Sequence, residues 1–387
     1  MNQADRWLLP DGIEELLPPE AKQLETIRRT LLDTFSHWGY ELVVPPQLEY
    51  LESLLTGVGK DLNLQTFKVT DQLTGRLMGL SADITPQVAR MDAHSWPKEG
   101  VNRLCYCAQA LHTRAESLIS SRAPILIGAE LFGEDSVNAD VETLSLLIES
   151  LHSMGLKQVH IDLGHVGIYQ ALVQKANFDH ATSVMIFEHL NTKSVTEYQT
   201  LIEQHVSDVA LKRAFLDLLT LNGDTSVLDQ AQSLQEIADV AAPLNNLKQI
   251  CQRLQQRYPS VDLFLDLAEL RGFDYHTGVV FAAYAPGFGQ ALALGGRYDD
   301  TGAVFGRARS ATGFSGDLKQ WLRVSEQKLQ TTEAIFAPLD ADWSAVTELR
   351  QQGKTVISGL SQLDSPAAYG CTSQLVLKQG QWIIETV

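Results

Sequence analysis

Hydrophobic positions along the chain follow two periods, which divide it into helices and strands. Within residues 22–38, apolar residues recur at helical spacing, and Gly39 is placed to end that helix. Alternation predicts strands at 40–50 (YELVVPPQLEY), which Pro45 and Pro46 end, and at 101–112 (VNRLCYCAQALH). The run APILIGAELFG, 123–133, is apolar enough for a strand that is buried on both faces.

The segments between and after these strands have different patterns. Residues 65–80 predict a hairpin with its turn at Leu73-Thr74-Gly75. Residues 81–95 predict a loop that enters a helix, with Thr85 as N-cap and Pro86 at the first helical position. A helix and a strand follow, and residues 167–255 are then mostly helical and polar. Residues 167–255 are therefore predicted to form a helical insertion.

Strand patterns return after the insertion and again near the C-terminus. Three strands are predicted from VDLFLDL, GVVFAAYA and QALALGG, and residues 333–387 alternate strand, helix, strand and hairpin. The chain of 387 residues is longer than one domain usually is. We therefore predict a core at 1–325, with the insertion at about 167–255, and a small C-terminal α/β domain at 330–387.

Composition limits the kinds of partner and the cellular compartment that fit this chain. The net charge is −17, from 30 Lys and Arg against 47 Asp and Glu, and no basic cluster is visible, which disfavours nucleic acid. The N-terminus lacks a signal-peptide pattern, and no apolar run is long enough to span a bilayer. The four cysteines have no metal-like spacing, and Cys105 and Cys107 should face one side of a strand. We expect a cytoplasmic, reduced protein without a metal.

Two clusters of polar residues suggest one pocket. RGFDYHTG spans 271–278 and LGGRYDD spans 294–300, and neither a phosphate-binding P-loop nor a catalytic triad pattern is present. Taken singly, each candidate has a structural explanation, such as a helix cap for Asp83 and Thr85. Together, acidic groups for an ammonium and an arginine for a carboxylate fit an amino-acid site. The candidates are Asp83, Thr85, Glu130, Arg271, Tyr275, His276 and Tyr298.

The order of these segments resembles the core of histidyl-tRNA synthetase, a class II synthetase. WGYELVVPPQLEY is similar to its first motif, RLCYCAQALH...ILIGAELFG lies where the second belongs, and ATGFSGDL lies where the third belongs. RGFDYHTG resembles the histidine-specific RGLDYYTG, and GGRYDD resembles GGRYDG. Over residues 7 to 325, the resemblance implies an α+β fold with an antiparallel sheet flanked by helices. It also implies a dimer built on residues 22–50.

The same resemblance gives each candidate a role. Asp83 and Thr85 match contacts to the amino group of the substrate, and Glu130 matches another ammonium contact. Tyr275, His276 and Tyr298 match histidine-pocket positions, with His276 in place of a tyrosine. Arg271 matches the arginine beside the substrate carboxylate and the activated phosphate.

Four positions depart from the synthetase pattern. His112 and Arg114 stand where the second motif has an arginine and a glutamate, and Gln320 stands where the third motif has an arginine. Leu126 replaces a glutamine of the pocket. Losing one donor that stabilises the transition state typically costs roughly 3–4 kcal/mol, so losing two should leave negligible adenylation.

The chain resembles more closely the regulatory subunits of ATP phosphoribosyltransferase, in SADITPQVARMDAH at 81–94 and in ATGFSGDL. That resemblance implies no catalysis and no cofactor of its own, and no tRNA partner. It implies assembly with a short-form catalytic subunit, usually as a hetero-octamer, which this subunit activates in the first step of histidine biosynthesis. It also implies feedback inhibition with L-histidine as the effector.

Two other functions remain open from the sequence. The chain could be a synthetase paralogue that adenylates an amino acid and loads a carrier, with Arg114 replacing the lost phosphate contact. ATP–pyrophosphate exchange would distinguish that enzyme from a regulatory subunit. It could also be an RNA-binding regulator, which a salt-dependent RNA shift would reveal.

Overall fold

The computed structural model describes residues 7–56, 60–115, 117, 120–273, 275–299, 301–327 and 333–387. Residue contacts divide the chain after Gln327 into two units, which are described separately. Residue 330, where the C-terminal domain was predicted to begin, lies outside the described residues, as do Asp274 and Asp300 of the two motifs.

A nine-stranded sheet forms the centre of the first unit. Its order is β1-β5-β6-β12-β11-β10-β7-β9-β8. Neighbours run antiparallel, except that β1 is parallel to β5 and β7 is parallel to β9. The sheet confirms the predicted antiparallel class. The strands are β1 (Glu41–Leu42), β5 (Asn102–Gln109), β6 (Ile125–Phe132), β7 (His160–His165), β8 (Asn222–Gly223), β9 (Asp262–Asp266), β10 (Val279–Tyr284), β11 (Ala293–Arg297) and β12 (Ala311–Asp317).

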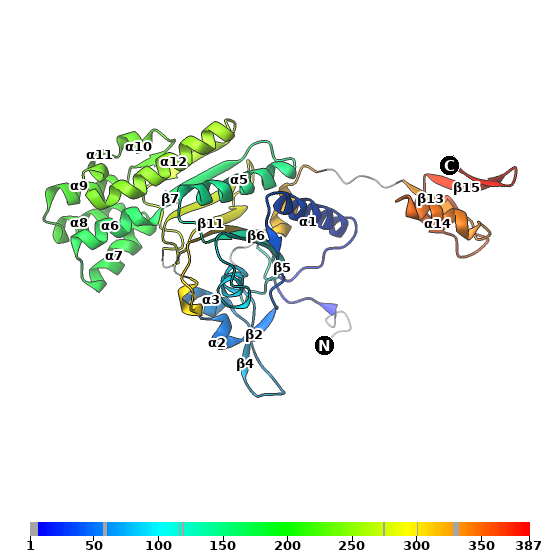
Figure 1. Ribbon diagram of the computed structural model, residues 1–387, viewed down its shortest axis with the longest axis horizontal. Helices are drawn as coiled ribbons and strands as arrows, with labels where there is room; N and C mark the ends of the chain where they lie inside the picture. Colours follow the sequence, from blue (N-terminus) through cyan, green and yellow to red (C-terminus); the bar gives the residue numbers. More distant parts are fainter. Residues whose placement is uncertain are drawn as a thin grey trace. The chain divides into compact units, whose positions relative to one another are not determined.

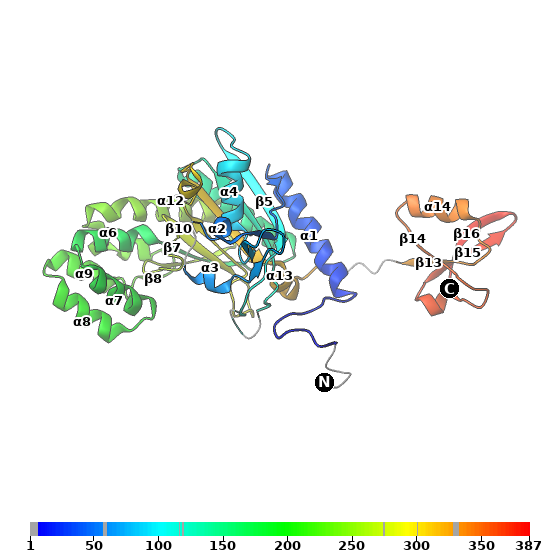
Figure 2. The same cartoon turned by 90° about the horizontal axis from the view of Figure 1, so that it is seen from below.

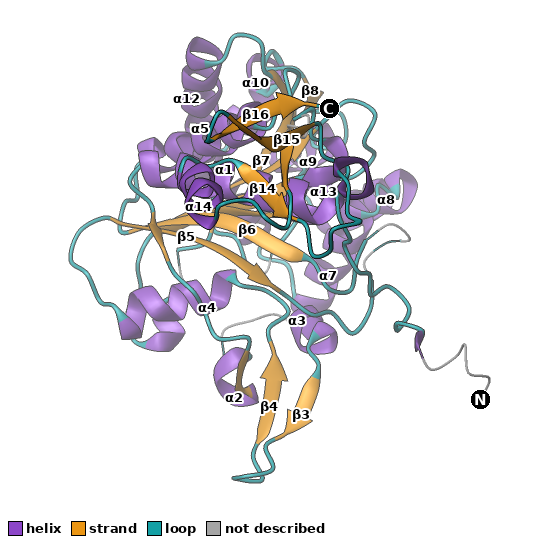
Figure 3. Cartoon of the chain, turned by 90° about the vertical axis from the view of Figure 1, so that its right-hand side faces the viewer, coloured by secondary structure: helices purple, strands orange, loops and turns teal. Residues whose placement is uncertain are grey.

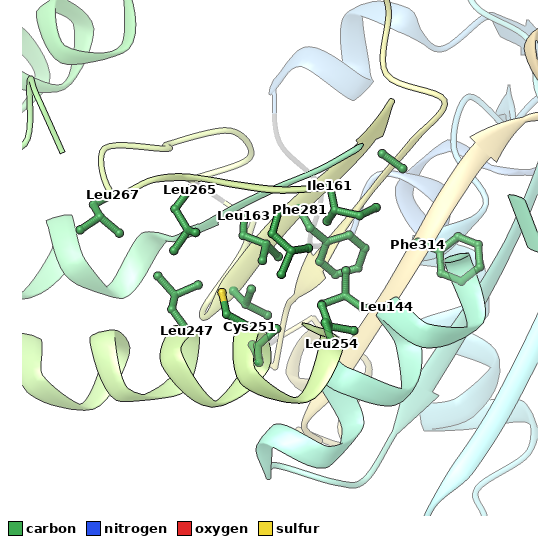
Figure 4. Close-up of a cluster of buried hydrophobic side chains, with 14 of the residues drawn as sticks. Leu144, Ile161, Leu163, Leu247, Cys251, Leu254, Leu265, Leu267, Phe281 and Phe314 are labelled. Carbon is green, nitrogen blue, oxygen red and sulfur yellow. The ribbon is translucent and has the colours of Figure 1, made fainter. Parts of the chain in front are cut away.

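Four helices cover one face of this sheet. They are α1 (Glu20–His37), α5 (Val137–Ser153), α12 (Ala241–Arg257) and α13 (Leu318–Val324). Figure 1 shows α5 and α12 lying along the strands, and Figure 4 shows the apolar side chains that fill the space between them. Successive strand residues point to opposite faces, so Cys105, Ile127 and Ala129 enter this core. Cys107 packs against the same core, as its spacing from Cys105 predicted.

The opposite face of the sheet carries smaller elements. Helices α2 (Leu51–Leu54), α3 (Lys60–Gln65) and α4 (Thr85–Arg90) lie over it, and a π-helical turn follows at Met91–Ser95 (Figure 2). In Figure 3, α4 and the β3–β4 hairpin lie on one side of β5 and β6, and α1 lies on the other. A three-stranded sheet, β2-β4-β3, accompanies them, with β2 at Leu48–Tyr50, β3 at Lys68–Thr70 and β4 at Leu77–Leu80.

The segment after β7, in which the sequence predicts a helical insertion at about 167–255, is mostly helical. Figure 1 shows α6 to α9 gathered beyond the β7 end of the sheet. Its last helix, α12, packs on α5 and β7, and so belongs to the layer that covers the sheet. The helices that precede α12 are α6 (Val166–Ala176), α7 (His180–Asn191), α8 (Val195–His205), α9 (Val209–Asp217), α10 (Val227–Gln230) and α11 (Gln232–Gln235).

The C-terminal unit has its own sheet and core. The strand order is β14-β13-β15-β16, in which β13 is parallel to both of its neighbours and β15–β16 is an antiparallel hairpin. Ile335, Val346, Val356 and Leu375 are buried together between the sheet and the helix. The elements are β13 (Ala334–Ala337), α14 (Trp343–Gln351), β14 (Thr355–Ser358), β15 (Ser373–Lys378) and β16 (Gln381–Thr386).

One sequence prediction about local structure was wrong. Thr85 does not cap α4, because it is already the first helical residue and Ile84 precedes the helix. The strand that begins this stretch ends before Pro45 and Pro46, as predicted, and the residues after the prolines form β2, which belongs to the small sheet and not to the large one. Within the described part of the chain, no helix is long and apolar enough to cross a bilayer.

Candidate functional site

A pocket of about 350 Å³ lies on the α4 face of the large sheet. Strands β6, β11 and β12 supply its floor, because their alternate residues point to this face. It brings together six of the seven predicted site residues, which come from the start of α4 and the loop before it, from β6 and from the two sequence motifs. These are Asp83, Thr85, Glu130, Tyr275, His276 and Tyr298.

Glu130 is the centre of the hydrogen bonds in this pocket. It is 1% exposed, and its Oε1 accepts hydrogen bonds from Thr85 Oγ1 at 3.0 Å and from the Tyr106 hydroxyl at 3.3 Å. Its Oε2 accepts a short hydrogen bond from the Tyr298 hydroxyl. Both carboxylate oxygens are thus satisfied, as a buried acid requires.

A glycine on the neighbouring strand makes room for this carboxylate. Gly313 of β12 pairs with Glu130, and a Cβ at residue 313 would lie 1.6 Å from Glu130 Oε2. A side chain at this position is therefore incompatible with the observed place of the acid.

The pKa of Glu130 is raised to about 8, chiefly by burial and in smaller part by the charge of Asp83, while hydrogen bonds from Tyr298, Thr85 and Tyr106 oppose the shift. Glu130 therefore carries a proton through most of the neutral range. A cationic ligand would favour the ionised carboxylate and would release that proton on binding.

Asp83 and the aromatic residues surround this acid. Thr85 is bonded to both acids: its backbone N–H donates to Asp83 Oδ1 at 3.2 Å, and its side-chain hydroxyl donates to Glu130. The Tyr275 ring stacks on Tyr298 with centroids 5.2 Å apart, and His276 meets Tyr275 edge-on at 5.4 Å. The aromatic rings give the pocket flat apolar walls beside its acids, which suits a ring-bearing amine.

The orientation of His276 fixes its tautomer. Its Nδ1 lies 3.1 Å from the Gly272 carbonyl oxygen, which can only accept, so Nδ1 carries the proton. Burial lowers the pKa of this imidazole to about 4, so it is neutral at physiological pH. Its Nε2 is therefore a hydrogen-bond acceptor.

Arg271 is the one predicted site residue that does not line this pocket. It lines a neighbouring cavity of about 160 Å³ together with Asp162, Glu269 and His276. Its Nη2 lies 3.3 Å from Glu269 Oε2. The cation is therefore engaged with an acid from its own loop.

The positions that depart from the synthetase pattern also surround the pocket. His112, Leu126 and Gln320 line it, and His112 Nε2 bonds the Ala82 carbonyl oxygen at 2.8 Å. Arg114 is exposed and is not among the lining residues. Among the described residues that line the pocket, none is lysine or arginine.

Sequence reasoning missed two residues of this site. Tyr106 lies between two core-facing cysteines on β5, so strict alternation would have turned it to the pocket face. Gly313 carried no signal of its own, since only its pairing with Glu130 explains the missing side chain.

Known proteins resemble this chain over nearly its whole length. The histidyl-tRNA synthetase family model matches residues 12–321, and that of the ATP phosphoribosyltransferase subunit HisZ C-terminal domain matches residues 332–385. ATP phosphoribosyltransferase regulatory subunits from Thioalkalivibrio sulfidiphilus and from Pseudomonas aeruginosa are each 50% identical to it. The alignments cover 99% of this chain, and 99% and 98% of those proteins respectively.

Solved structures share the fold at lower identity. An ATP phosphoribosyltransferase regulatory subunit/histidyl-tRNA synthetase from Bacillus halodurans superimposes with a TM-score of 0.82 at 24% identity, over 96% of this chain and 97% of that one. An ATP phosphoribosyl transferase (HisG:HisZ) complex from Thermotoga maritima gives 0.60 at 18% identity, over 79% and 98%. Half of the residues are identical to those of curated relatives from end to end, and the chain therefore belongs to the family of ATP phosphoribosyltransferase regulatory subunits.

Proposed function

We propose that this chain is a regulatory subunit which activates a separate catalytic subunit of ATP phosphoribosyltransferase and binds L-histidine as the feedback effector. It adenylates no amino acid and uses no cofactor. The names of the relatives that are half identical to it support the first part. The lining of the Glu130 pocket supports the rest.

The observation that carries the proposal is the charge of this pocket. Its described lining includes three acids, Asp83, Glu130 and Asp317, and no lysine or arginine. Stabilising a triphosphate during adenylation requires preorganised cations, whereas an ammonium or an imidazole N–H requires acceptors. The pocket therefore favours the amine and the ring of histidine over a nucleotide.

The remaining contact of an amino acid is its carboxylate. Arg271 is the candidate for it, and the cavity that Arg271 lines adjoins the Glu130 pocket at His276. A guanidinium can bind a carboxylate through two parallel hydrogen bonds, which would distinguish an amino acid from a simple amine.

Assembly is the second part of the proposal. The structure from Thermotoga maritima that shares this fold is a HisG:HisZ complex, which supports a catalytic partner for this chain. We further propose a dimer through α1 and the neighbouring residues up to 50, where Leu42, Val44 and Leu48 expose apolar side chains. A hetero-octamer with the catalytic subunit would contain such dimers.

Feedback by histidine then follows from linkage. Histidine can inhibit a distant active site only if it binds one state of the assembly more tightly than another. A coupling free energy of about 1–3 kcal/mol would change activity several-fold to a hundredfold.

Calorimetric titration with L-histidine, with and without the short catalytic subunit, tests the proposal. Wild type should bind, Glu130→Gln should weaken binding because it removes the anionic acceptor, and Arg271→Ala should weaken it through the carboxylate. Glu236→Gln, a change at an exposed carboxylate of the insertion, serves as the control. ATP–pyrophosphate exchange should be absent.

Two outcomes would contradict this function. Exchange above background with histidine and ATP would make the chain an amino-acid-activating enzyme. Absence of histidine binding in the chain and in the assembly would mean that the subunit acts through protein contacts alone.

A further inference from the structure

The Glu130 pocket and the Arg271 cavity meet at a shared wall. The two have three lining residues in common, Leu294, Gly295 and His276. Leu294 and Gly295 belong to strand β11, whereas His276 comes from the loop that also carries Arg271. The side chain that can move without breaking the sheet is therefore that of His276.

The His276 ring fits tightly between two glycines. A Cβ on Gly272 would lie 2.4 Å from His276 Nδ1, and a Cβ on Gly296 would lie 2.6 Å from its Cδ2. The ring thus fills the space that side chains would occupy at both positions. Its Nδ1–H also donates to the Gly272 carbonyl oxygen at 3.1 Å, which holds it there.

This placement has a consequence for any amino acid in the Glu130 pocket. The acids that would receive its amine lie on one side of His276, and Arg271 lines the cavity on the other side. No described lining residue of the first pocket is a cation, so the ligand carboxylate finds none while the ring stays in place.

We infer that His276 is the partition of a two-part site, and that displacement of its side chain admits the ligand carboxylate to Arg271. This inference rests on the proposed function and adds a residue that controls it. His276 acts here as a positioning residue, because it determines whether Arg271 can reach the ligand. Arg271 Nη2 would then exchange its 3.3 Å contact with Glu269 Oε2 for the ligand carboxylate, while Glu269 Oε1 could still accept the Arg271 backbone N–H that it holds at 2.8 Å.

Two ligands can distinguish the proposed partition from a direct contact between His276 and the ligand. L-Histidine needs Arg271 for its carboxylate, whereas L-histidinol has the same amine and ring with a hydroxymethyl group in place of the carboxylate. If wild type spends most of its time closed, its apparent affinity for L-histidine is reduced by the fraction that is open. Removing the ring should remove that reduction for L-histidine and leave the affinity for L-histidinol unchanged.

Calorimetry with both ligands on the full chain tests this in wild type, His276→Ala, Arg271→Ala and the double variant. His276→Ala should tighten L-histidine binding about tenfold if a tenth of the wild-type molecules are open, with L-histidinol affected less than twofold. In the double variant the two ligands should bind alike. His205→Ala, a change at an exposed histidine of α8, is the control.

The outcomes are distinguishable. Equal weakening of both ligands by His276→Ala would overturn the inference, because the ring would then be a direct contact, and the proposed function would stand. Unchanged binding of both ligands would overturn it as well. Absence of binding in every protein would overturn the proposed function and the inference together, whereas binding in His276→Ala alone would support the partition.

Discussion

Two groups of residues line the same pocket and differ in how they are held. Around Glu130, Thr85, Tyr106 and Tyr298 donate hydrogen bonds to a fully buried carboxylate, so the acid is fixed by three elements of the fold. The second group consists of His112 and Gln320, which stand where a synthetase has the two arginines that hold phosphates, and we call these two positions the clamp positions. His112 bonds a backbone carbonyl oxygen, and Gln320 offers an uncharged amide.

The difference shows how a regulatory subunit can share the fold of an enzyme. In the proposed function, recognition of an amine depends on the Glu130 network, which also stabilises the core, so removing that network would cost stability. Of the two clamp positions, His112 is buried and Gln320 is half-buried, so Gln320 can change without repacking the sheet. We expect perturbations of the Glu130 group to affect both stability and binding, and a change at Gln320 to affect nucleotide binding alone.

The largest expected effect concerns the proton on Glu130. The pKa of this acid is raised to about 8 in the folded chain, so folding retains a proton that the unfolded chain releases above its ordinary pKa near 4.5. This contribution to stability is full below pH 4.5 and is lost as the pH rises to 8. Glu130→Gln should remove a pH-dependent term of roughly 5 kcal/mol between those limits.

Denaturant unfolding of wild type and Glu130→Gln at pH 5 and pH 9 checks this prediction. The variant should gain stability relative to wild type at pH 9. Glu236→Gln, an exposed carboxylate on the insertion, should follow wild type at both pH values. Parallel pH profiles for wild type and Glu130→Gln would show that Glu130 is already ionised in the folded chain.

The second largest effect is steric. Gly313→Ala places a methyl group where Glu130 Oε2 and the Ala129 carbonyl oxygen lie, at 1.6 and 2.7 Å. Overpacking of this kind should lower the free energy of unfolding by about 3 kcal/mol and should displace the carboxylate. Gly289→Ala is the matched control, since no atom lies within 4 Å of its Cβ position. Similar unfolding midpoints for the two variants would mean that β12 can shift to accept the methyl group.

The sequence predicted most of the elements because their periods are regular. The apolar spacing of α1 and the alternation of β5 and β6 are strong, and the charge of Glu130 in an apolar strand identified the centre of the site. Thr85 was wrongly predicted to be the N-cap, because a threonine directly before Pro86 fits both an N-cap and the first residue of the helix.

Other features depend on contacts between distant segments. Tyr106 reads as one more core aromatic until β5 is paired with β6 and its hydroxyl reaches Glu130. Arg271 and His276 are five residues apart in the sequence, yet spacing cannot tell that His276 lines both cavities whereas Arg271 lines only the smaller one. Orientation within a loop is set by its glycines and neighbours, and not by periodicity.

A smaller effect is expected from one hydroxyl. Tyr298 donates to Glu130 Oε2 and thereby lowers the pKa of an acid that burial raises. Tyr298→Phe should raise this pKa further, so ionising Glu130 for an ammonium ligand costs more. Affinity for L-histidine at pH 7 should fall by roughly 1.5–2 kcal/mol, about tenfold to thirtyfold, and the pH at which affinity reaches its plateau should move upward.

Titrations of Tyr298→Phe at several pH values check that shift. Tyr369→Phe, which removes a hydroxyl from the C-terminal unit, is the matched control. A uniform loss of affinity at every pH would assign the Tyr298 hydroxyl to the ligand instead of to Glu130.

The smallest expected effect is a gain in ATP affinity from a change at the clamp position Gln320. Gln320→Arg places a cation at the edge of a pocket whose described lining has none, and Gln320 is only half-buried, so solvent screens the new charge. Affinity for ATP should rise by about 1 kcal/mol, roughly fivefold, without affecting L-histidine binding or stability. Gln352→Arg adds the same charge to an exposed position of the C-terminal unit and should leave ATP binding unchanged. An equal gain in both variants would mean that the added positive charge acts through the net charge of the chain, which is −17 before the substitution. A loss of stability in Gln320→Arg alone would show that this clamp position is as tightly packed into the core as the Glu130 group.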